Sequence, residues 1–256
     1  NNIVNLTNFS LNNKVALITG GTSGIGKMMA LALARAGAFV WIASTRDNAD
    51  ETISEIKQQG SEGAFFQVDV TDYNKLETML SHIYGVSKKI DILVNSAGIN
   101  LRIPAEDLSL DDWQKTININ LTAPYYLSQL VVKKMKENQW GRIINIASLQ
   151  SLRAFDDSIP YGASKGGVMQ LTRALAQSYS KHGILVNAIA PGFFNTKLTE
   201  SLFKDPEKLQ TLADKTMMNR NGEERDLFGI SVFLCSDANS YITGQTIFLD
   251  GGFTAQ

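Results

Sequence analysis

Short apolar segments alternate with helical patterns along nearly the whole chain, and this alternation limits the folds that the sequence can adopt. We expect strands over residues 15–19, 39–43, 64–68, 90–94, 142–146, 184–190 and 246–249. We expect helices over residues 26–36, 48–59, 72–83, 111–136, 161–182 and 224–234. Each strand segment is almost continuously apolar, which is typical of parallel strands covered on both faces. The pattern predicts an α/β fold, with a Rossmann-type, doubly wound parallel sheet of about seven strands and helices on both faces.

The chain of 256 residues contains no repeat, linker or low-complexity tract, so we expect a single domain. Residues 1–12 are interpreted as an N-terminal arm, and residues 13–256 as the dinucleotide-binding and catalytic domain. Residues 193–221 lack a clear periodic pattern, and long irregular segments often carry function. We expect this segment to be a substrate lid in which Met217 and Met218 line the pocket, with adaptable packing as their alternative role.

The composition narrows the class of protein. The formal net charge is −1, which predicts no general attraction to nucleic acid or to an anionic membrane. The first ten residues are polar, and no apolar run reaches the roughly 20 residues of a membrane span, so a cytoplasmic location is expected. Cys235 is the only cysteine, which excludes an intrachain disulfide, and we expect it to be a small buried apolar side chain. We expect no metal site.

A glycine-rich turn joins the first expected strand to the first expected helix. Such a turn brings backbone N–H groups close to a phosphate, and the helix dipole favours the negative charge. The spacing of Gly20, Gly24 and Gly26 differs from the common G-x-G-x-x-G pattern, and a tight turn without a ligand is the alternative. Its place in the first strand–helix unit favours dinucleotide binding. The predicted contacts here are Gly20, Thr22, Ser23, Gly24, Ile25 and Gly26.

The end of the second strand should meet the adenosine ribose, where an acidic side chain favours NAD and a basic one favours NADP. Ser44, Thr45 and Arg46 occupy this position, and none of them is acidic. A guanidinium group can form two hydrogen bonds to a phosphate, so we favour NADP(H) over NAD(H). Asp47 leaves an alternative open, because it either neutralises Arg46 or binds the ribose itself.

Tyr161 and Lys165 lie four residues apart at the start of an expected helix, so they share one face. A tyrosine with a pKa near 10 is a poor base, but a neighbouring ammonium group stabilises the phenolate. Such a pair can move the proton that accompanies hydride transfer between an alcohol and a ketone. The pair is common on protein surfaces, so it needs support from other motifs.

Taken together, the motifs from Lys14 to Phe253 resemble the short-chain dehydrogenase/reductase family. Asn95-Ser96-Ala97-Gly98 is similar to the family's Asn-Asn-Ala-Gly segment, with Ser96 in place of the second Asn. The resemblance implies that Ser148, Tyr161, Lys165 and Asn120 are catalytic, with Asn118 as the competing assignment for Asn120 and Ser151 for Ser148. It also implies cofactor contacts from Asp69, Val70, Asn95, Ala97, Gly98, Tyr161, Lys165, Pro191, Gly192, Phe194 and Thr196.

Within the family, the chain is most similar to sugar-acid dehydrogenases of the gluconate 5-dehydrogenase and 2-deoxygluconate 3-dehydrogenase type. Arg102 and Arg153 are candidates to face the substrate carboxylate, although both are also consistent with ordinary surface charges. A 3-oxoacyl-carrier-protein reductase is the alternative, with Lys133, Lys134 and Lys136 as a basic patch for the acidic carrier. A non-catalytic nucleotide-binding regulator or scaffold is the alternative of another class. The family resemblance implies a homotetramer and a small-molecule carbonyl or alcohol substrate.

Overall fold

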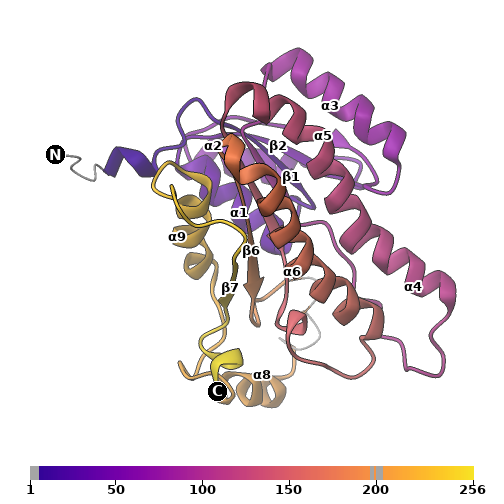
Figure 1. Cartoon of the computed structure of the whole chain (residues 1–256). Coiled ribbons are helices and arrows are strands. Elements are labelled where there is room, and N and C mark those ends of the chain that lie inside the picture. Colours follow the sequence, from indigo (N-terminus) through magenta and orange to yellow (C-terminus); the bar gives the residue numbers. More distant parts are fainter. Residues whose placement is uncertain (1–5, 197–198, 200–203) are drawn as a thin grey trace.

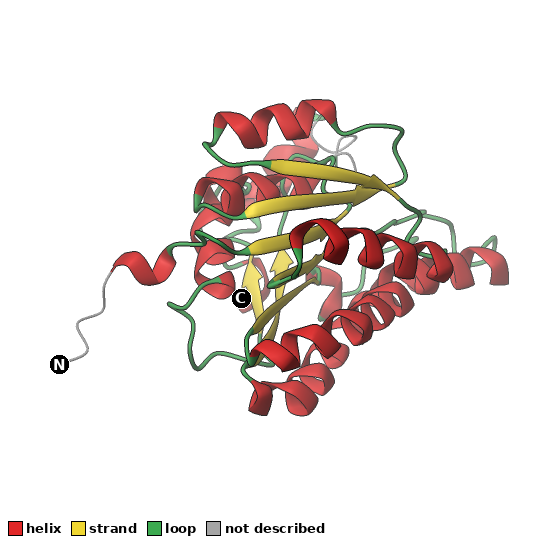
Figure 2. Cartoon of the chain, turned by 90° about the horizontal axis from the view of Figure 1, so that it is seen from above, coloured by secondary structure: helices red, strands yellow, loops and turns green. Residues whose placement is uncertain are grey.

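The computed structural model describes residues 6–196, 199 and 204–256. Its sheet is parallel throughout and contains seven strands in the order β3-β2-β1-β4-β5-β6-β7, which confirms the predicted fold class (Figure 2). The strands are β1 (Val15–Thr19), β2 (Phe39–Ser44), β3 (Gly63–Gln67), β4 (Ile92–Asn95), β5 (Gly141–Ile146), β6 (Ile184–Pro191) and β7 (Thr246–Leu249). The fourth strand therefore begins two residues later than expected.

Helices cover both faces of this sheet (Figures 1 and 2). They are α1 (Gly24–Arg35), α2 (Asp50–Gln58), α3 (Tyr73–Ser87), α4 (Leu110–Ile117), α5 (Ala123–Asn138), α6 (Ile159–Tyr179), α8 (Pro206–Asp214) and α9 (Glu224–Cys235). Shorter 3-10 turns are η1 (Leu6–Phe9), η3 (Leu149–Ser151), η4 (Ser180–His182) and η5 (Phe253–Ala255). None of the helices in the described part of the chain is long and apolar enough to cross a membrane.

Two apolar cores follow from the alternation of side chains along each strand. In β1, Ala16 and Ile18 point to one face, where they pack with residues of α1, α2 and α9. Val15 and Leu17 point to the other face, where they pack with residues of α3, α5 and α6. Cys235 belongs to the first core and is completely buried, as expected, and this burial raises the pKa of its thiol to about 12. A thiol with this pKa is a packing group and not a nucleophile.

The single helix expected over residues 111–136 is interrupted. Between α4 and α5 the chain makes a π-helical turn, η2 (Asn118–Thr122). Within this turn the buried Asn120 side chain turns toward the segment after β4, where it bonds the backbone of Ile99. Single π-turns of this kind occur frequently at functional sites.

The predicted lid is also more regular than expected. It contains α8, and Phe194 forms a parallel bridge with Gly222 across the base of the segment. Residues 197–198 and 200–203 of the lid lie outside the described residues. At the other end of the chain, Leu11 of the predicted N-terminal arm is completely buried in the core beside α1.

The topology determines where a ligand can bind. Strands β2 and β3 are added on one side of β1, and strands β4 to β7 are added on its other side. The direction in which strands are added therefore reverses between β1 and β4. In open sheets of this kind, ligands bind beyond the carboxyl ends of the strands at this reversal. All seven carboxyl ends lie at the same edge, because the sheet is parallel.

Candidate active site

A cavity of about 1060 Å³ lies at the carboxyl ends of the strands. Its walls come from the β1–α1 turn and from the ends of β2, β4, β5 and β6. It brings together most of the residues that the sequence predicted: Gly20, Thr22, Ser23, Gly24, Ile25, Ser44, Thr45, Arg46, Asp69, Val70, Ala97, Gly98, Ser148, Tyr161, Lys165, Pro191, Gly192, Phe194 and Thr196. Gly26, Asn95 and Asn120 do not line it.

The glycines of the β1–α1 turn have separate roles. Gly20 and Gly24 have φ angles of 68° and 55°, in the left-handed region that side chains disfavour. A Cβ atom at Gly26 would lie 2.5 Å from the carbonyl oxygen of Gly20, so Gly26 allows α1 to pack against the turn. No side chain caps the start of α1 at Ser23, which leaves its first N–H groups facing the cavity. The turn therefore suits an anion such as a pyrophosphate.

Asn95 supports the site from the interior of the sheet. Its side-chain amide donates to Asn145 Oδ1 at 2.8 Å and to Ser128 Oγ at 3.2 Å. Asn145 in turn donates to Thr172 Oγ1 at 3.0 Å. These four side chains are almost completely buried, so their network ties β4 and β5 to α5 and α6. The structure thus places Asn95 behind the cavity wall.

Arg46 lines the part of the cavity that follows β2, and it is exposed. Among the described residues it forms no ion pair. The neighbouring Asp47 carboxylate instead accepts a hydrogen bond of 3.2 Å from Gln67. The guanidinium group of Arg46 is therefore available to a ligand, and Asp47 does not neutralise it through direct contact.

Ser148, Tyr161 and Lys165 meet at the middle of the cavity. Ser148 follows β5 and accepts a hydrogen bond from the backbone N–H of Gln150, which fixes the turn at the start of η3. Tyr161 and Lys165 lie on the first turns of α6, and Lys165 Nζ is 5.6 Å from the centre of the tyrosine ring. Lys165 Nζ also donates to the carbonyl oxygen of Ile146 at 2.6 Å, which anchors it to the end of β5.

Burial perturbs the pKa values of both members of this pair. Burial lowers the pKa of Lys165 to about 8, because a charged ammonium group loses its hydration there. Burial also raises the pKa of Tyr161, although a hydrogen bond with Ser148 and the charge of Arg102 act in the opposite direction. In the protein without cofactor, burial therefore opposes the phenolate form that neighbouring positive charges stabilise. The phenol of Tyr161 is neutral at physiological pH and ready to donate a proton.

Asn120 is almost completely buried beneath the catalytic residues. Its amide oxygen accepts from Ile99 N at 2.9 Å, and its amide nitrogen donates to Ile99 O at 2.9 Å and to Ser164 Oγ at 3.1 Å. These bonds join the segment after β4 to α6. The competing candidate, Asn118, instead accepts a hydrogen bond from Gln114 near the surface.

The predicted substrate contacts divide into two groups. Arg102 lines the cavity, and its φ of 54° is unusual for a residue with a side chain. Arg153 does not line the cavity, because its guanidinium group donates to the carbonyl oxygens of Thr254 and Gln256. Met217 and Met218 also lie outside it, since they pack against the glycine turn at 251–252. The expectation that these two methionines line the pocket is therefore wrong.

Sequence reasoning missed several residues that line the same cavity. They are Ser96, Ile99, Asn100, Lys115, Ile119, Leu149, Gln150, Phe155, Asp156, Ser158, Phe193, Thr199 and Leu212. Many of them lie in the segments between a strand and the next helix, a position that many surface residues share, and others, such as Lys115 and Leu212, lie within helices. Ser158 shows the difficulty, because it is buried and faces Asn100, 58 residues away in the sequence.

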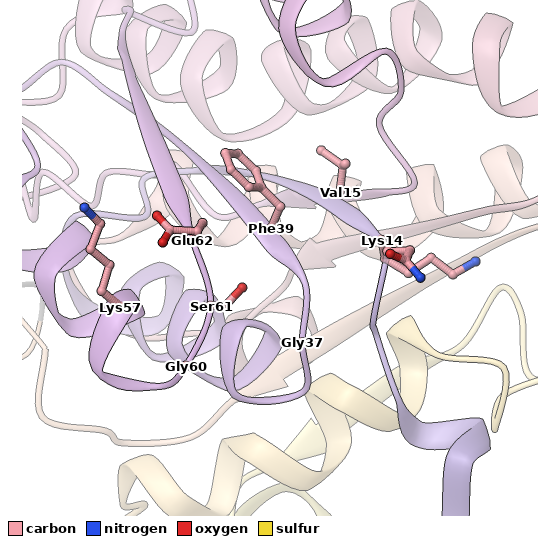
Figure 3. Close-up of a pocket in the computed structure, with 9 residues that line it drawn as sticks. Lys14, Val15, Gly37, Phe39, Lys57, Gly60, Ser61 and Glu62 are labelled. Atoms are coloured by element: carbon pink, nitrogen blue, oxygen red, sulfur yellow. The ribbon is translucent and has the colours of Figure 1, made fainter.

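A second hollow lies at the opposite, amino-terminal edge of the sheet (Figure 3). It lies among the start of β1, the start of β2 and the end of α2. Lys57 and Lys14 stand on opposite sides of it and do not point toward one another. This hollow holds no paired acid and base among its lining residues that resembles the Tyr161–Lys165 arrangement.

Comparison with known proteins identifies the family. A family model described as enoyl-(acyl carrier protein) reductase matches residues 20–254. The 2-dehydro-3-deoxy-D-gluconate 5-dehydrogenase of Pseudoalteromonas atlantica is 39% identical over 250 residues, covering 97% of this chain and 98% of that protein. A crystal structure of a gluconate 5-dehydrogenase from Burkholderia cenocepacia J2315, in complex with NADP and tartrate, has 35% identity and a TM-score of 0.91, covering 98% of both chains.

A short-chain type dehydrogenase/reductase from Mycobacterium marinum gives the same result, with 34% identity and a TM-score of 0.91. The match covers 98% of this chain and 99% of that one. The matched residues 20–254 include most of the glycine turn, the serine after β5 and the tyrosine–lysine pair on α6. The chain belongs to the short-chain dehydrogenase/reductase family and is an oxidoreductase that acts on CH–OH groups.

Proposed function

We propose that this protein interconverts a secondary alcohol and a ketone on a sugar acid, with NADP(H) as its cofactor. The observation that carries the proposal is the meeting of Ser148, Tyr161 and Lys165 in one cavity with Arg102, which forms no ion pair among the described residues. The similar gluconate 5-dehydrogenase that binds NADP supports both the substrate class and the cofactor. The free guanidinium group of Arg46 supports a 2′-phosphate at the adenosine end.

The residues present fit such a cofactor. The uncapped start of α1 and the positive φ angles of Gly20 and Gly24 suit its pyrophosphate. Once bound, NADP(H) supplies or accepts the hydride at the substrate carbon. Lys165, anchored on Ile146, holds its ammonium group on the side of the cavity where the nicotinamide ribose is expected.

The proton is handled by the protein. Ser148 and Tyr161 offer two hydroxyl groups to the substrate oxygen, which fixes its position. In the reduction direction, the neutral phenol of Tyr161 donates its proton to the oxygen as negative charge develops there. In the oxidation direction, Tyr161 must accept a proton; the charge of Arg102 favours its phenolate form, and a protonated Lys165, 5.6 Å from the ring centre, acts in the same direction.

Arg102 supports a substrate that carries a carboxylate. It forms no ion pair among the described residues, yet its charge lowers the pKa of Tyr161. The guanidinium group is therefore near the phenol. A carboxylate held by Arg102 through two hydrogen bonds would place the neighbouring carbinol or ketone carbons near Tyr161.

The acyl-carrier alternative lacks this kind of support. Lys134 forms an ion pair with Glu137, and Lys136 lies over the ring of Tyr179. These lysines are at the end of α5, next to the start of β5, and so at the sheet edge opposite the cavity. A carrier docked on them would be remote from Tyr161.

A substrate panel tests the proposal. We expect NADPH oxidation with 5-ketogluconate and NADP⁺ reduction with gluconate, and much weaker turnover of an acetoacetyl thioester. The opposite preference would favour the carrier-protein reductase. Cofactor binding without turnover of any carbonyl would favour the non-catalytic regulator.

Tyr161→Phe tests the mechanism. We expect kcat to fall by at least about 100-fold because the proton donor is lost, while the affinity for NADPH stays within about twofold. Tyr241→Phe is the matched control, since Tyr241 is 96% exposed and outside the cavity. Near-normal turnover by Tyr161→Phe would show that this tyrosine is not the acid. The cytoplasmic location and the homotetramer stay predictions.

A further inference from the structure

The segment that follows β7, residues 251–256, packs beside the mouth of the cavity; we call it the C-terminal turn. In Figure 1 the end of the chain marked C lies next to α8, at the carboxyl-terminal edge of the sheet. The turn itself does not line the cavity. One aromatic ring of the turn contacts two rings that line the cavity, and carbonyl groups of its backbone accept hydrogen bonds from Arg153.

Three phenylalanine rings from distant segments meet here. Phe253 lies with its ring centre 5.6 Å from that of Phe193, in an edge-to-face arrangement. It also stacks on Phe155, with 6.4 Å between the centres and an interplanar angle of 21°. Phe155 and Phe193 are 6.4 Å apart, and both line the cavity. Phe253 therefore stands behind the two rings that a substrate would touch.

Arg153 fastens the turn to the catalytic segment. Its Nη2 atom donates to the carbonyl oxygen of Thr254 at 3.3 Å and to that of Gln256 at 3.1 Å. Arg153 lies two residues before Phe155, on the segment that leads from Ser148 to α6. These two hydrogen bonds therefore tie the C-terminal turn to the segment that carries Phe155, one of the aromatic rings of the cavity.

The turn is itself rigidly built. Asp250 accepts hydrogen bonds from Gly252 N at 2.9 Å and from Thr254 N at 2.9 Å, and its second bond to Thr254 comes from the hydroxyl group at 2.7 Å. Gly251 O accepts from Met218 N at 3.2 Å, which joins the turn to the chain after α8. These hydrogen bonds fix the backbone of the C-terminal turn, so the ring of Phe253 is a fixed support for Phe155 and Phe193.

From these contacts we propose that Phe253 and Arg153 are positioning residues, which hold Phe155 and Phe193 as the apolar wall of the substrate pocket. Such a wall offers no hydrogen bond to a hydroxyl group. A polyhydroxy chain therefore turns its C–H face to the rings and its hydroxyl groups to the polar lining at Asn100, Gln150 and Ser158. The wall thus contributes to the choice of which carbon faces Tyr161. The substrate part of this inference rests on the proposed function, whereas the support of the two rings does not.

Phe253→Ala tests the wall. We expect the KM for 5-ketogluconate to rise by about tenfold and kcat to change by less than about threefold, because the loosened wall weakens ground-state positioning. The affinity for NADPH should stay within about twofold, since the ring contacts of Phe253 are with Phe155 and Phe193, neither of which is a predicted cofactor residue. Arg153→Ala should shift KM in the same direction, and Phe253→Tyr, which keeps the ring, should restore the wild-type KM.

Phe9→Ala is the matched control. Phe9 is 37% exposed, and its ring centre lies 6.4 Å from that of Phe233, outside the cavity lining. The Phe9→Ala variant loses an aromatic contact that lies away from the cavity, so we expect its KM to equal that of the wild type. An equal rise of KM in Phe9→Ala and Phe253→Ala would overturn the proposal, because the effect would then be general destabilisation.

Amide hydrogen exchange measures the support without any substrate. Peptides that cover residues 149–158 should exchange faster in Phe253→Ala and Arg153→Ala than in Phe9→Ala or the wild type. Unchanged exchange in both variants would overturn the proposal. If the wild type turns over no sugar acid but exchange rises as expected, the proposed function fails and the role of the turn stands.

Discussion

Replacing Arg46 with alanine should change the cofactor preference without affecting the fold. Arg46 is exposed, lines the adenosine end of the cavity and has no ion-pair partner among the described residues. Removing it therefore breaks no contact that supports the structure. The free energy of unfolding should change by less than about 0.5 kcal/mol.

The expected loss in affinity follows from the kind of contact. A hydrogen bond to a charged group contributes about 1.5–3 kcal/mol, and about 1.4 kcal/mol corresponds to a factor of ten in Kd. The exposure of Arg46 lets water and salt compete, so we expect the lower half of this range. NADPH binding should weaken by about 10- to 50-fold, and NADH binding should change by less than about twofold.

Titration of NADPH and NADH fluorescence with the wild type, Arg46→Ala and Arg35→Ala measures this directly. Arg35 is an exposed arginine at the other end of α1, so its loss controls for net charge. Asp47→Asn separates the two sequence interpretations of this position. If Asp47 binds the ribose, this variant weakens NADH binding; if Gln67 holds the carboxylate aside, both affinities persist. An equal loss of NADPH and NADH affinity in Arg46→Ala would refute the assignment of Arg46 to the 2′-phosphate.

Two stability predictions complete the set. Since the pKa of Lys165 is about 8 in the folded protein and 10.5 for an unperturbed lysine, the unfolded chain holds a proton that the folded chain lacks between these pH values. The free energy of unfolding of the wild type, relative to that of Lys165→Met, should therefore rise by about 2 kcal/mol from pH 7.5 to pH 9.5. Urea unfolding without cofactor measures it, and a difference that does not change with pH would contradict the prediction. Asn145→Ala should cost about 3 kcal/mol, because Asn95 and Thr172 lose a partner inside the sheet; a cost below about 1 kcal/mol would mean that the buried network is dispensable.

The sheet was predictable because its signal is local and repeated. Each strand is a short apolar run, and a segment such as residues 15–19 must be covered on both faces wherever it lies. The cofactor turn and Tyr161–Lys165 were also accessible, since each is a short motif at one strand or helix end. Ser148 required the family resemblance, because a serine after a strand has no distinctive pattern of its own.

The remaining features depend on tertiary contacts. The side chain of Asn120 bonds Ile99, 21 residues away, and no periodicity shows this. The π-turn around it interrupts a sequence whose helical pattern is continuous. Met217 and Met218 lie beside the glycine turn at 251–252 and remain largely exposed, and no pattern in the sequence shows which way they face. The effect of burial on the Tyr161 pKa also depends on the tertiary structure, because the sequence does not show how deeply the ring is buried.

The π-turn η2 has a consequence for how this chain tolerates changes of length. An α-helix rotates by about 100° per residue, and a π-turn contains one residue more than the α-helical turn it replaces. Upstream of it α4 packs on α6, and downstream α5 packs on β4, β5 and β6. Loss of one residue between Asn118 and Thr122 would leave an ordinary α-helical turn, so α4 and α5 would keep their faces while Asn120 would lose the bulge that directs its side chain toward Ile99. The turn therefore absorbs its extra residue locally, and a single-residue deletion there should disturb the placement of Asn120 more than the packing of the two helices.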